Sequence, residues 1–115
     1  MYYVGAVRPN RKDRMFRAVA DPTRRNILER LHERELTVLE LCEPFRITQP
    51  SLSKHLAVLR RSGLIFARRS GRHRYYRLSP ESLEHIAAWV AQFRDVRGPS
   101  GHIWRLPQIH ERKDT

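Results

Sequence analysis

The sequence predicts a mainly α-helical domain with one small β-hairpin, and three observations indicate this fold class. Apolar residues recur at helical spacing in several segments, and capping residues, Pro and Gly separate these segments. Two β-type runs flank Ser70-Gly71-Arg72, where Gly71 can adopt positive φ for a tight turn. The chain has 115 residues, enough for one domain of ordinary size. We therefore expect about five helices and a two-stranded hairpin.

The first two helices are expected at residues 12–20 and 22–33. Asp21 and Pro22 separate them, because Asp accepts the free amide protons of a first helical turn and Pro is preset for its first position. The apolar stripe of the first helix contains Met15, Phe16 and Val19. That of the second contains Ile27, Leu28 and Leu31, while Arg24, Arg25 and Arg30 are expected to face outward.

Capping residues also bound the third and fourth helices. Thr37 and Glu40 have the spacing of a capping box, and the short helix after Thr37 should end near Pro44 because proline cannot continue it. Thr48 caps the fourth helix, which runs to Ser62 before Gly63 supplies a left-handed stop. One arc of this helix is a core seam of Leu52, Leu56 and Leu59. The opposite arc carries Ser51, Lys54, Ala57, Val58 and Arg61.

The hairpin strands are expected at residues 64–69 and 73–78, and a last helix follows. Ser79, Pro80 and Glu81 open that helix, which should extend to about residue 97. Its stripe contains Leu83, Ile86, Val90 and Phe93, widened by Ala87 and Trp89. The sequence after Gly98 is expected to be irregular, with Ile103, Trp104, Leu106 and Ile109 as possible anchors. We thus divide the chain into a flexible arm (1–10), one domain (11–97) and a C-terminal tail (98–115).

Positive charge is concentrated in one segment of the chain. Between Pro44 and Pro80 the sequence has nine Lys or Arg residues and no Asp or Glu, and this segment supplies nine units of the formal net charge of +11. The nine residues are Arg46, Lys54, Arg60, Arg61, Arg68, Arg69, Arg72, Arg74 and Arg77. A solvated charged face normally intersperses both signs, whereas a focused cationic surface favours association with phosphate backbones.

Helix, helix, short helix, capped helix, basic hairpin and final helix is the order of a winged helix-turn-helix. In this arrangement the capped helix lies across the major groove of DNA and the hairpin places cations along neighbouring phosphates. Gln can pair bidentately with adenine, and Lys can donate to guanine. The expected recognition-helix contacts are Thr48, Gln49, Ser51, Ser53, Lys54 and His55, although His55 could instead pack against the wing. The expected wing and backbone contacts are Arg68, Arg69, Arg72, His73 and Arg74.

Three ordered motifs also resemble a known family, the arsenical-resistance-repressor type (ArsR-like) of bacterial winged-helix regulators. Residues 16–28 are similar to the opening helices of that family, residues 49–65 to its recognition helix and following turn, and residues 69–78 to its wing. The resemblance covers roughly residues 13–96. It implies a homodimeric transcriptional repressor whose first and last helices build the dimer interface. It also implies DNA contacts at Gln49, Ser51, Ser53, Lys54 and His55.

The sequence departs from the metal-sensing members of that family. Thr37 stands where they have their first third-helix Cys, Glu40 is near the companion position, and Cys42 is displaced from the expected spacing. The last helix has His85 but no Asp-x-His pairing. A soft-metal site needs several converging thiolates or imidazoles. We therefore expect no metal site and no cofactor. We interpret Cys42 as a small buried residue, and a redox or metalloid sensor formed by an intersubunit pair of Cys42 is the open alternative.

Large apolar side chains on the first and last helices indicate a second copy of the chain as a partner. A domain of this size has too little interior to bury all of them. The residues expected at this homodimer interface are Met15, Phe16, Val19, Ile86, Trp89, Val90 and Phe93. A dimer also places two recognition helices one DNA turn apart, about 34 Å, to match an inverted repeat.

The predicted function is thus a homodimeric repressor that binds double-stranded DNA, with any small-molecule effector unspecified. Two other binding functions are open: an adaptor whose basic face binds an acidic partner, and an RNA-binding protein. RNA binding has less support, because Tyr75 and Tyr76 are the only aromatic pair near the basic segment. No nucleophile elbow, phosphate loop or paired catalytic carboxylates predict an enzyme. No apolar run is long enough for a membrane span, and a single Cys favours a cytoplasmic protein.

Overall fold

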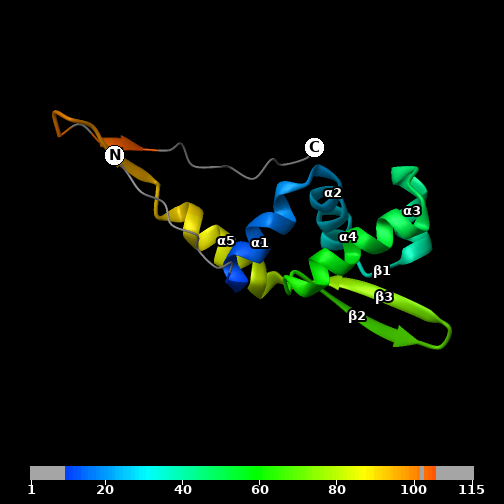
Figure 1. The fold of residues 1–115 in the computed structure, drawn as a ribbon. Helices are drawn as coiled ribbons and strands as arrows, with labels where there is room; N and C mark the ends of the chain where they lie inside the picture. Colours follow the sequence, from blue (N-terminus) through cyan, green and yellow to red (C-terminus); the bar gives the residue numbers. More distant parts are fainter. Residues whose placement is uncertain (1–9, 102, 106–115) are drawn as a thin grey trace, which may run out of the picture.

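The chain folds into five helices and five short strands in the computed structural model, which describes residues 10–101 and 103–105 (Figure 1). In order, the elements are α1 (Arg11–Ala20), α2 (Pro22–Glu33), β1 (Leu36–Thr37), α3 (Val38–Phe45), α4 (Gln49–Arg61), β2 (Ile65–Ser70), β3 (His73–Leu78), α5 (Pro80–Ala91), β4 (Asp95–Arg97) and β5 (Ile103–Arg105). The expected N-terminal arm lies outside the described residues, apart from residue 10. Leu106 and Ile109 of the expected tail also lie outside them.

The predicted caps form at the starts of α2, α3 and α4. The Arg24 amide donates to the Asp21 carboxylate at 2.9 Å. Thr37 and Glu40 form the reciprocal capping box, since the amide of each donates to the side chain of the other. The hydroxyl of Thr48 accepts from the amide of Ser51 at 3.2 Å. Because each cap satisfies amide protons that have no partner inside its helix, these helices begin where the sequence predicted.

Two arginines at the start of α2 cap the end of α1; Arg24 is half-buried there, contrary to the prediction, whereas Arg25 is exposed, as predicted. Arg24 donates from Nε to the Ala18 carbonyl at 2.8 Å and from Nη2 to the Arg17 carbonyl at 3.0 Å. Arg25 donates from Nη1 to the carbonyls of Val19 and Ala20, each at 2.9 Å. The last four carbonyls of a helix have no partner within it. The two guanidinium groups therefore satisfy the C-terminal turn of α1.

Pro44 lies inside α3, which continues to Phe45, one residue beyond the expected end. Proline has no amide proton, so the carbonyl of Glu40, four residues earlier, lacks its usual helical partner. The Nη2 of Arg30 donates to that carbonyl at 3.4 Å. Arg30 is thus half-buried and contacts α3, whereas the sequence predicted an outward side chain.

The hairpin belongs to a three-stranded antiparallel sheet with strand order β1-β3-β2. β2 and β3 pair in the register Ile65 with Leu78 and Ser70 with His73, and Gly71 has a φ of 62° in the turn. β1 was not predicted. It contributes only Leu36 and Thr37, paired with Tyr76 and Tyr75, and two residues are too short to produce an alternating pattern.

The core forms where α1, α2 and α4 meet the sheet. The buried apolar residues are Met15, Ala18, Ile27, Leu28, Leu31, Leu36, Leu41, Leu52, Leu56, Leu59, Leu64, Ile65 and Tyr76. The leucine seam of α4 is among them, as predicted, and the helix stops before Gly63, which has a φ of 79°. Burial of this seam determines which arc of α4 faces solvent.

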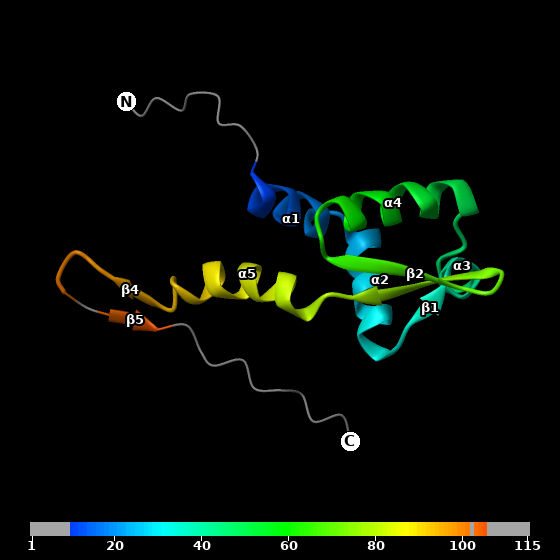
Figure 2. The same ribbon diagram turned by 90° about the horizontal axis from the view of Figure 1, so that it is seen from below.

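The end of α5 differs most from the prediction. The helix stops at Ala91 instead of near residue 97, because the amides of Phe93 and Arg94 donate to carbonyls three residues earlier and not four. A second hairpin follows, in which β4 pairs with β5 through residues 95–97 and 103–105. This hairpin replaces the irregular backbone expected for residues 103–105. Figure 2 shows α5 leading away from the sheet, with the β4–β5 hairpin beyond it.

Candidate nucleic-acid interface

The start and the outer arc of α4 present most of the predicted recognition residues to solvent. Thr48, Gln49, Ser51, Ser53 and Lys54 are all exposed. Ser51 and Lys54 lie on the arc opposite the buried leucines, whereas Thr48 and Gln49 stand at the helix start. These side chains supply amide, hydroxyl and ammonium groups without a buried partner to displace. They therefore have the donors and acceptors that base edges and phosphates require.

His55 is positioned differently from its neighbours on α4. Its side chain is 26% exposed, and its Nδ1 lies 3.8 Å from Asp21 Oδ2 and 3.4 Å from Arg24 Nη1. The imidazole thus faces the start of α2, and its predicted DNA contact stays a prediction. The backbone hydrogen bond from Arg24 is the main cause that lowers the pKa of Asp21, and the charges of Arg24 and His55 add to it.

A groove separates the start of α4 from the tip of the wing. Its volume is about 240 Å³, and it brings Gln49 of the recognition helix opposite three predicted wing residues. The lining residues are Thr37, Val38, Leu39, Gln49, Arg72, His73 and Arg74. Gln49, Arg72, His73 and Arg74 lie far apart in sequence but border one space. The fold therefore joins the two halves of the predicted site.

The two faces of the wing differ in how their arginines are used. Arg69 and Arg74 are cross-strand partners, and alternation places them on the face that also carries Ile65 and Tyr76 toward the core. Both arginines are exposed. They lie beyond the core, on the side of the sheet where α4 contacts β2. This face is suited to carry cations beside the recognition helix.

Arg68 lies on the opposite face, where it pairs with a carboxylate, and its predicted contact with the DNA backbone stays a prediction. Its Nη2 is 2.6 Å from Glu35 Oε2, its Nε donates to the same carboxylate, and its guanidinium stacks 4.9 Å from the centre of the Tyr75 ring. The hydrogen bond from Arg68 lowers the pKa of Glu35. The pair with Glu35 offsets part of the positive charge of Arg68. The sequence could not reveal this pair, because its members are 33 residues apart.

The focused positive charge survives folding in most of the basic segment. All nine cations are exposed. Within the described residues, Arg68 is the member of this set that forms an ion pair with a carboxylate. Arg77 shares the far face of the wing, where it stacks over Phe66 at 5.0 Å. The unpaired cations beside α4 therefore keep a positive electrostatic potential there. The opposite face of the wing, with Arg68 and Arg77, contributes less to it.

Leu39 is a groove residue that the sequence reasoning missed. It is 68% exposed, although it belongs to a helix with a strongly apolar sequence. The capping box at Thr37 sets the start of α3 and thereby aims position 39 into the groove beside Gln49. The available signal was this cap, which places Leu39 in the first turn of α3, whereas its position beside the wing depends on the folded chain.

The residues expected at a dimer interface separate into a buried and an exposed group. Met15 is 1% exposed and packs in the chain's own core, so its side chain has no surface to offer a second copy. Phe16, Val19 and Ile86 are half-buried. Trp89, Val90 and Phe93 are 50%, 49% and 46% exposed. An aromatic row connects α1 to the end of α5, with ring centres 5.1 Å apart for Phe16 and Trp89 and 4.8 Å apart for Trp89 and Phe93.

Metal-ligand residues do not converge in the part of the chain that the structure describes: no group of three or more His, Cys, Asp or Glu side chains there could hold an ion. Cys42 is half-buried against the core. Among the described residues, no helix is both long and apolar enough to cross a membrane.

Known proteins with similar sequences and structures are transcriptional regulators. Residues 21–66 match the family model "Bacterial regulatory protein, arsR family". The chain is 42% identical over 95 residues to the arsenical resistance operon repressor of Escherichia coli K12, covering 82% of this chain and 73% of that one. It is 37% identical over 79 residues to the transcriptional repressor SdpR of Bacillus subtilis 168, covering 69% and 88%. The crystal structure of the ArsR family transcriptional regulator RHA00566 superposes with a TM-score of 0.68 at 39% identity, covering 76% and 91%.

Proposed function

This chain belongs to the arsR family of bacterial regulatory proteins, and from that premise we propose that it is a homodimeric repressor that binds an inverted-repeat operator in duplex DNA. Members of the family are DNA-binding transcriptional regulators, not enzymes. The observation that carries the proposal for this chain is the groove in which Gln49 faces Arg72, His73 and Arg74.

The groove and the exposed arc of α4 supply two kinds of DNA contact. Gln49 and Lys54 are exposed near the start of α4, the part of a recognition helix that reaches base edges in the major groove. Arg69, Arg72 and Arg74 are exposed on the adjoining wing and can bind phosphates on the flanking backbone. Base contacts then determine which sequence is bound, and phosphate contacts determine most of the affinity.

The aromatic row of α1 and α5 supports the homodimer. Trp89 and Phe93 are half exposed in the single chain although each stacks edge to face on a neighbouring ring. Exposed aromatic clusters of this kind are typical of protein interfaces, and aromatic residues are enriched among those that carry most binding energy. A two-fold axis through this surface would pair two recognition helices and require a palindromic operator.

Selection of bound duplexes from a random-sequence pool by the purified protein tests the proposal. We expect an enriched inverted repeat whose half-sites are about one helical turn, roughly 34 Å, apart. Affinity for that duplex should fall by roughly a thousandfold or more between about 50 and 200 mM salt if about six to ten phosphates are engaged. Failure to enrich any duplex, with retained binding to an acidic protein, would contradict the proposal and favour the adaptor function.

A further inference from the structure

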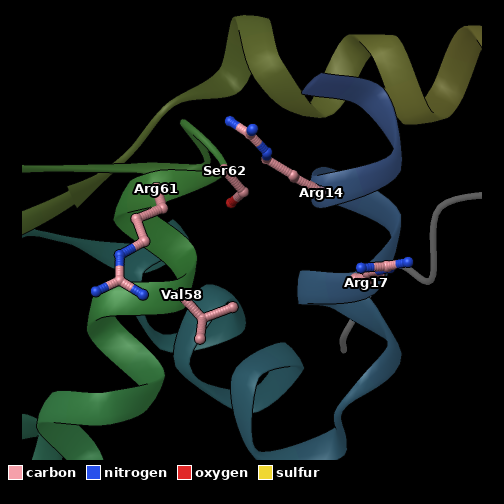
Figure 3. Close-up of a pocket in the computed structure, with 5 residues that line it drawn as sticks. All are labelled: Arg14, Arg17, Val58, Arg61 and Ser62. Atoms are coloured by element: carbon pink, nitrogen blue, oxygen red, sulfur yellow. The ribbon is translucent and has the colours of Figure 1, made fainter. Parts of the chain in front are cut away.

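A second cationic recess lies between α1 and α4, outside the recognition residues predicted from sequence. It has a volume of about 420 Å³ and is lined by Arg14, Arg17, Val58, Arg61 and Ser62 (Figure 3). We propose that this recess binds a phosphate of the operator backbone, so that the DNA-binding surface extends from α4 onto α1. The inference rests on the proposed function and adds α1 to the surface that carries it out.

The recess continues the outer arc of α4 toward the end of that helix. Val58 and Arg61 follow Lys54 by four and seven residues, which is one and two helical turns along the same side. Arg61 is exposed like Lys54. Figure 2 shows α1 beside the C-terminal half of α4, and α1 also packs against α5. The face that would meet DNA at Lys54 therefore passes over this recess.

Helix length places a phosphate near the recess. Twelve residues separate Gln49 from Arg61, which corresponds to about 18 Å along the helix axis. The major groove is only about 12 Å wide. For a helix whose axis crosses the groove with Gln49 at the base edges, Arg61 is placed at the rim of the groove, toward the sugar-phosphate backbone. Figure 3 shows Arg14 reaching from α1 toward the end of α4, so α1 supplies cations at the same point.

The arginines of the recess are not used to hold the fold together. Within the described residues, no carboxylate forms an ion pair with Arg14, Arg17 or Arg61. The acid of α1 in this region, Asp13, accepts from the amide of Asn10 at 2.9 Å as part of a capping box. Arg24, Arg25 and Arg68, in contrast, are occupied by the carbonyls of α1 and by Glu35. The recess therefore carries uncompensated charge that a phosphate would neutralise.

The chemistry of the recess favours a backbone phosphate over a captured small molecule. Its inner wall is formed by Val58 and by Ser62, whose buried hydroxyl already donates to the Leu59 carbonyl at 2.7 Å. No lining side chain therefore offers a free, buried polar group that would orient a small ligand. The arginines are exposed, and guanidinium groups bind phosphate oxygens in a bidentate manner. A phosphate that passes over an open rim fits this arrangement.

The test measures operator affinity against salt for the full chain, the double variant Arg14→Gln/Arg17→Gln and the control Arg77→Gln. The control removes an exposed cation from the far face of the wing. We expect the slope of log K against log salt to become shallower by about 0.9 for each phosphate that the double variant no longer binds, and to stay unchanged in the control. The base preference selected from a random pool should be unchanged in both. Arg14→Lys/Arg17→Lys should restore the slope, which separates charge from any loss of folding.

Three results would overturn the inference in distinguishable ways. Equal slopes for the double variant and the wild type would remove α1 from the DNA surface while leaving the proposed function intact. Absence of any selected duplex for the wild type would refute both. Calorimetric binding of phenyl phosphate or inorganic phosphate to the DNA-free chain, abolished in the double variant while the operator slope is unchanged, would assign the recess to a free anion instead.

Discussion

Helices α4 and α5 are built alike but have opposite surroundings. Each has a Pro in its first turn, and each carries an apolar stripe. The stripe of α4 is fully buried at Leu52, Leu56 and Leu59, and its outer arc is polar and cationic. On α5 the apolar side chains of Trp89 and Val90 remain half exposed. The amphipathic pattern thus predicts that a helix has a face to cover, but only the structure shows whether the same chain covers it.

The largest expected effect comes from breaking the seam of α4. Leu56 is 1% exposed, so Leu56→Ala removes buried methyl groups and leaves a cavity. We expect the free energy of unfolding to fall by about 2–5 kcal/mol, measured by urea denaturation. The matched control is Leu39→Ala, whose leucine is 68% exposed and should change stability by less than about 0.5 kcal/mol. Similar losses in both variants would contradict the assignment of the core.

The second prediction concerns the uncovered face of α5. Trp89→Ala should weaken self-association by about thirtyfold or more, since a buried interface Trp typically contributes at least about 2 kcal/mol. Sedimentation equilibrium measures this change. Phe66→Ala is the control, because Phe66 is an exposed aromatic residue (45%) on the wing. If Phe66→Ala dissociates the protein and Trp89→Ala does not, the aromatic row is not the interface.

Substitutions in the exposed N-terminal half of α4 should have a smaller and more selective effect. Lys54→Ala or Gln49→Ala should reduce discrimination between the operator and a one-base variant by about 1–3 kcal/mol. Arg72→Ala and Arg74→Ala should weaken binding to all duplexes alike, because phosphate contacts carry no sequence information directly. Competitive titration with a matched and a mismatched duplex measures both effects. A changed base preference in the wing variants alone would reverse these roles.

The smallest effect is expected for the pH dependence of stability at Asp21, the N-cap of α2, which lies beside His55 of α4. The pKa of Asp21 is lowered in the folded chain, so its stabilising contribution is complete above its unfolded pKa of about 4 and is lost as pH falls through the lower folded value. Asp21→Asn keeps a capping side chain but removes this titration. Thermal unfolding at pH 6 and pH 3 should therefore show a smaller loss of Tm in the variant. An identical loss in both proteins would contradict the predicted linkage.

Local signals predicted the fold well where capping residues determine a boundary. α2 and α4 begin after Asp21 and Thr48 because a single side chain satisfies amides within the same turn. The end of α5 was wrong for the opposite reason: apolar spacing continues through Phe93, and neither Gly nor Pro interrupts it before Gly98. The stop at Ala91 is accompanied by pairing of β4 with β5, which no local pattern announces.

The candidate site was predictable in its residue types but not in its contacts. Exposure of Lys54 follows from helical periodicity, and so does burial of the leucine seam. Gln49 is three residues before Leu52, on the same side of the helix as the seam, and it is exposed at the first residue of α4. Pairing of Arg68 with Glu35, and of Arg24 with the carbonyls of α1, depends on which side chains meet after folding. Charge counting treats every arginine as equal. The structure separates those that hold the fold from those available to a ligand.

Arg24 stands where three helices meet, and this position has a mechanical consequence. It is bonded to the end of α1, it belongs to α2, and it lies beside His55 of α4. A rotation of α1, which carries part of the aromatic row, relative to α4, which is proposed to read base pairs, would therefore break the contacts of Arg24. In the proposed dimer, the distance between the two copies of α4 would then be fixed by contacts within each chain before DNA binds, and not adjusted on binding.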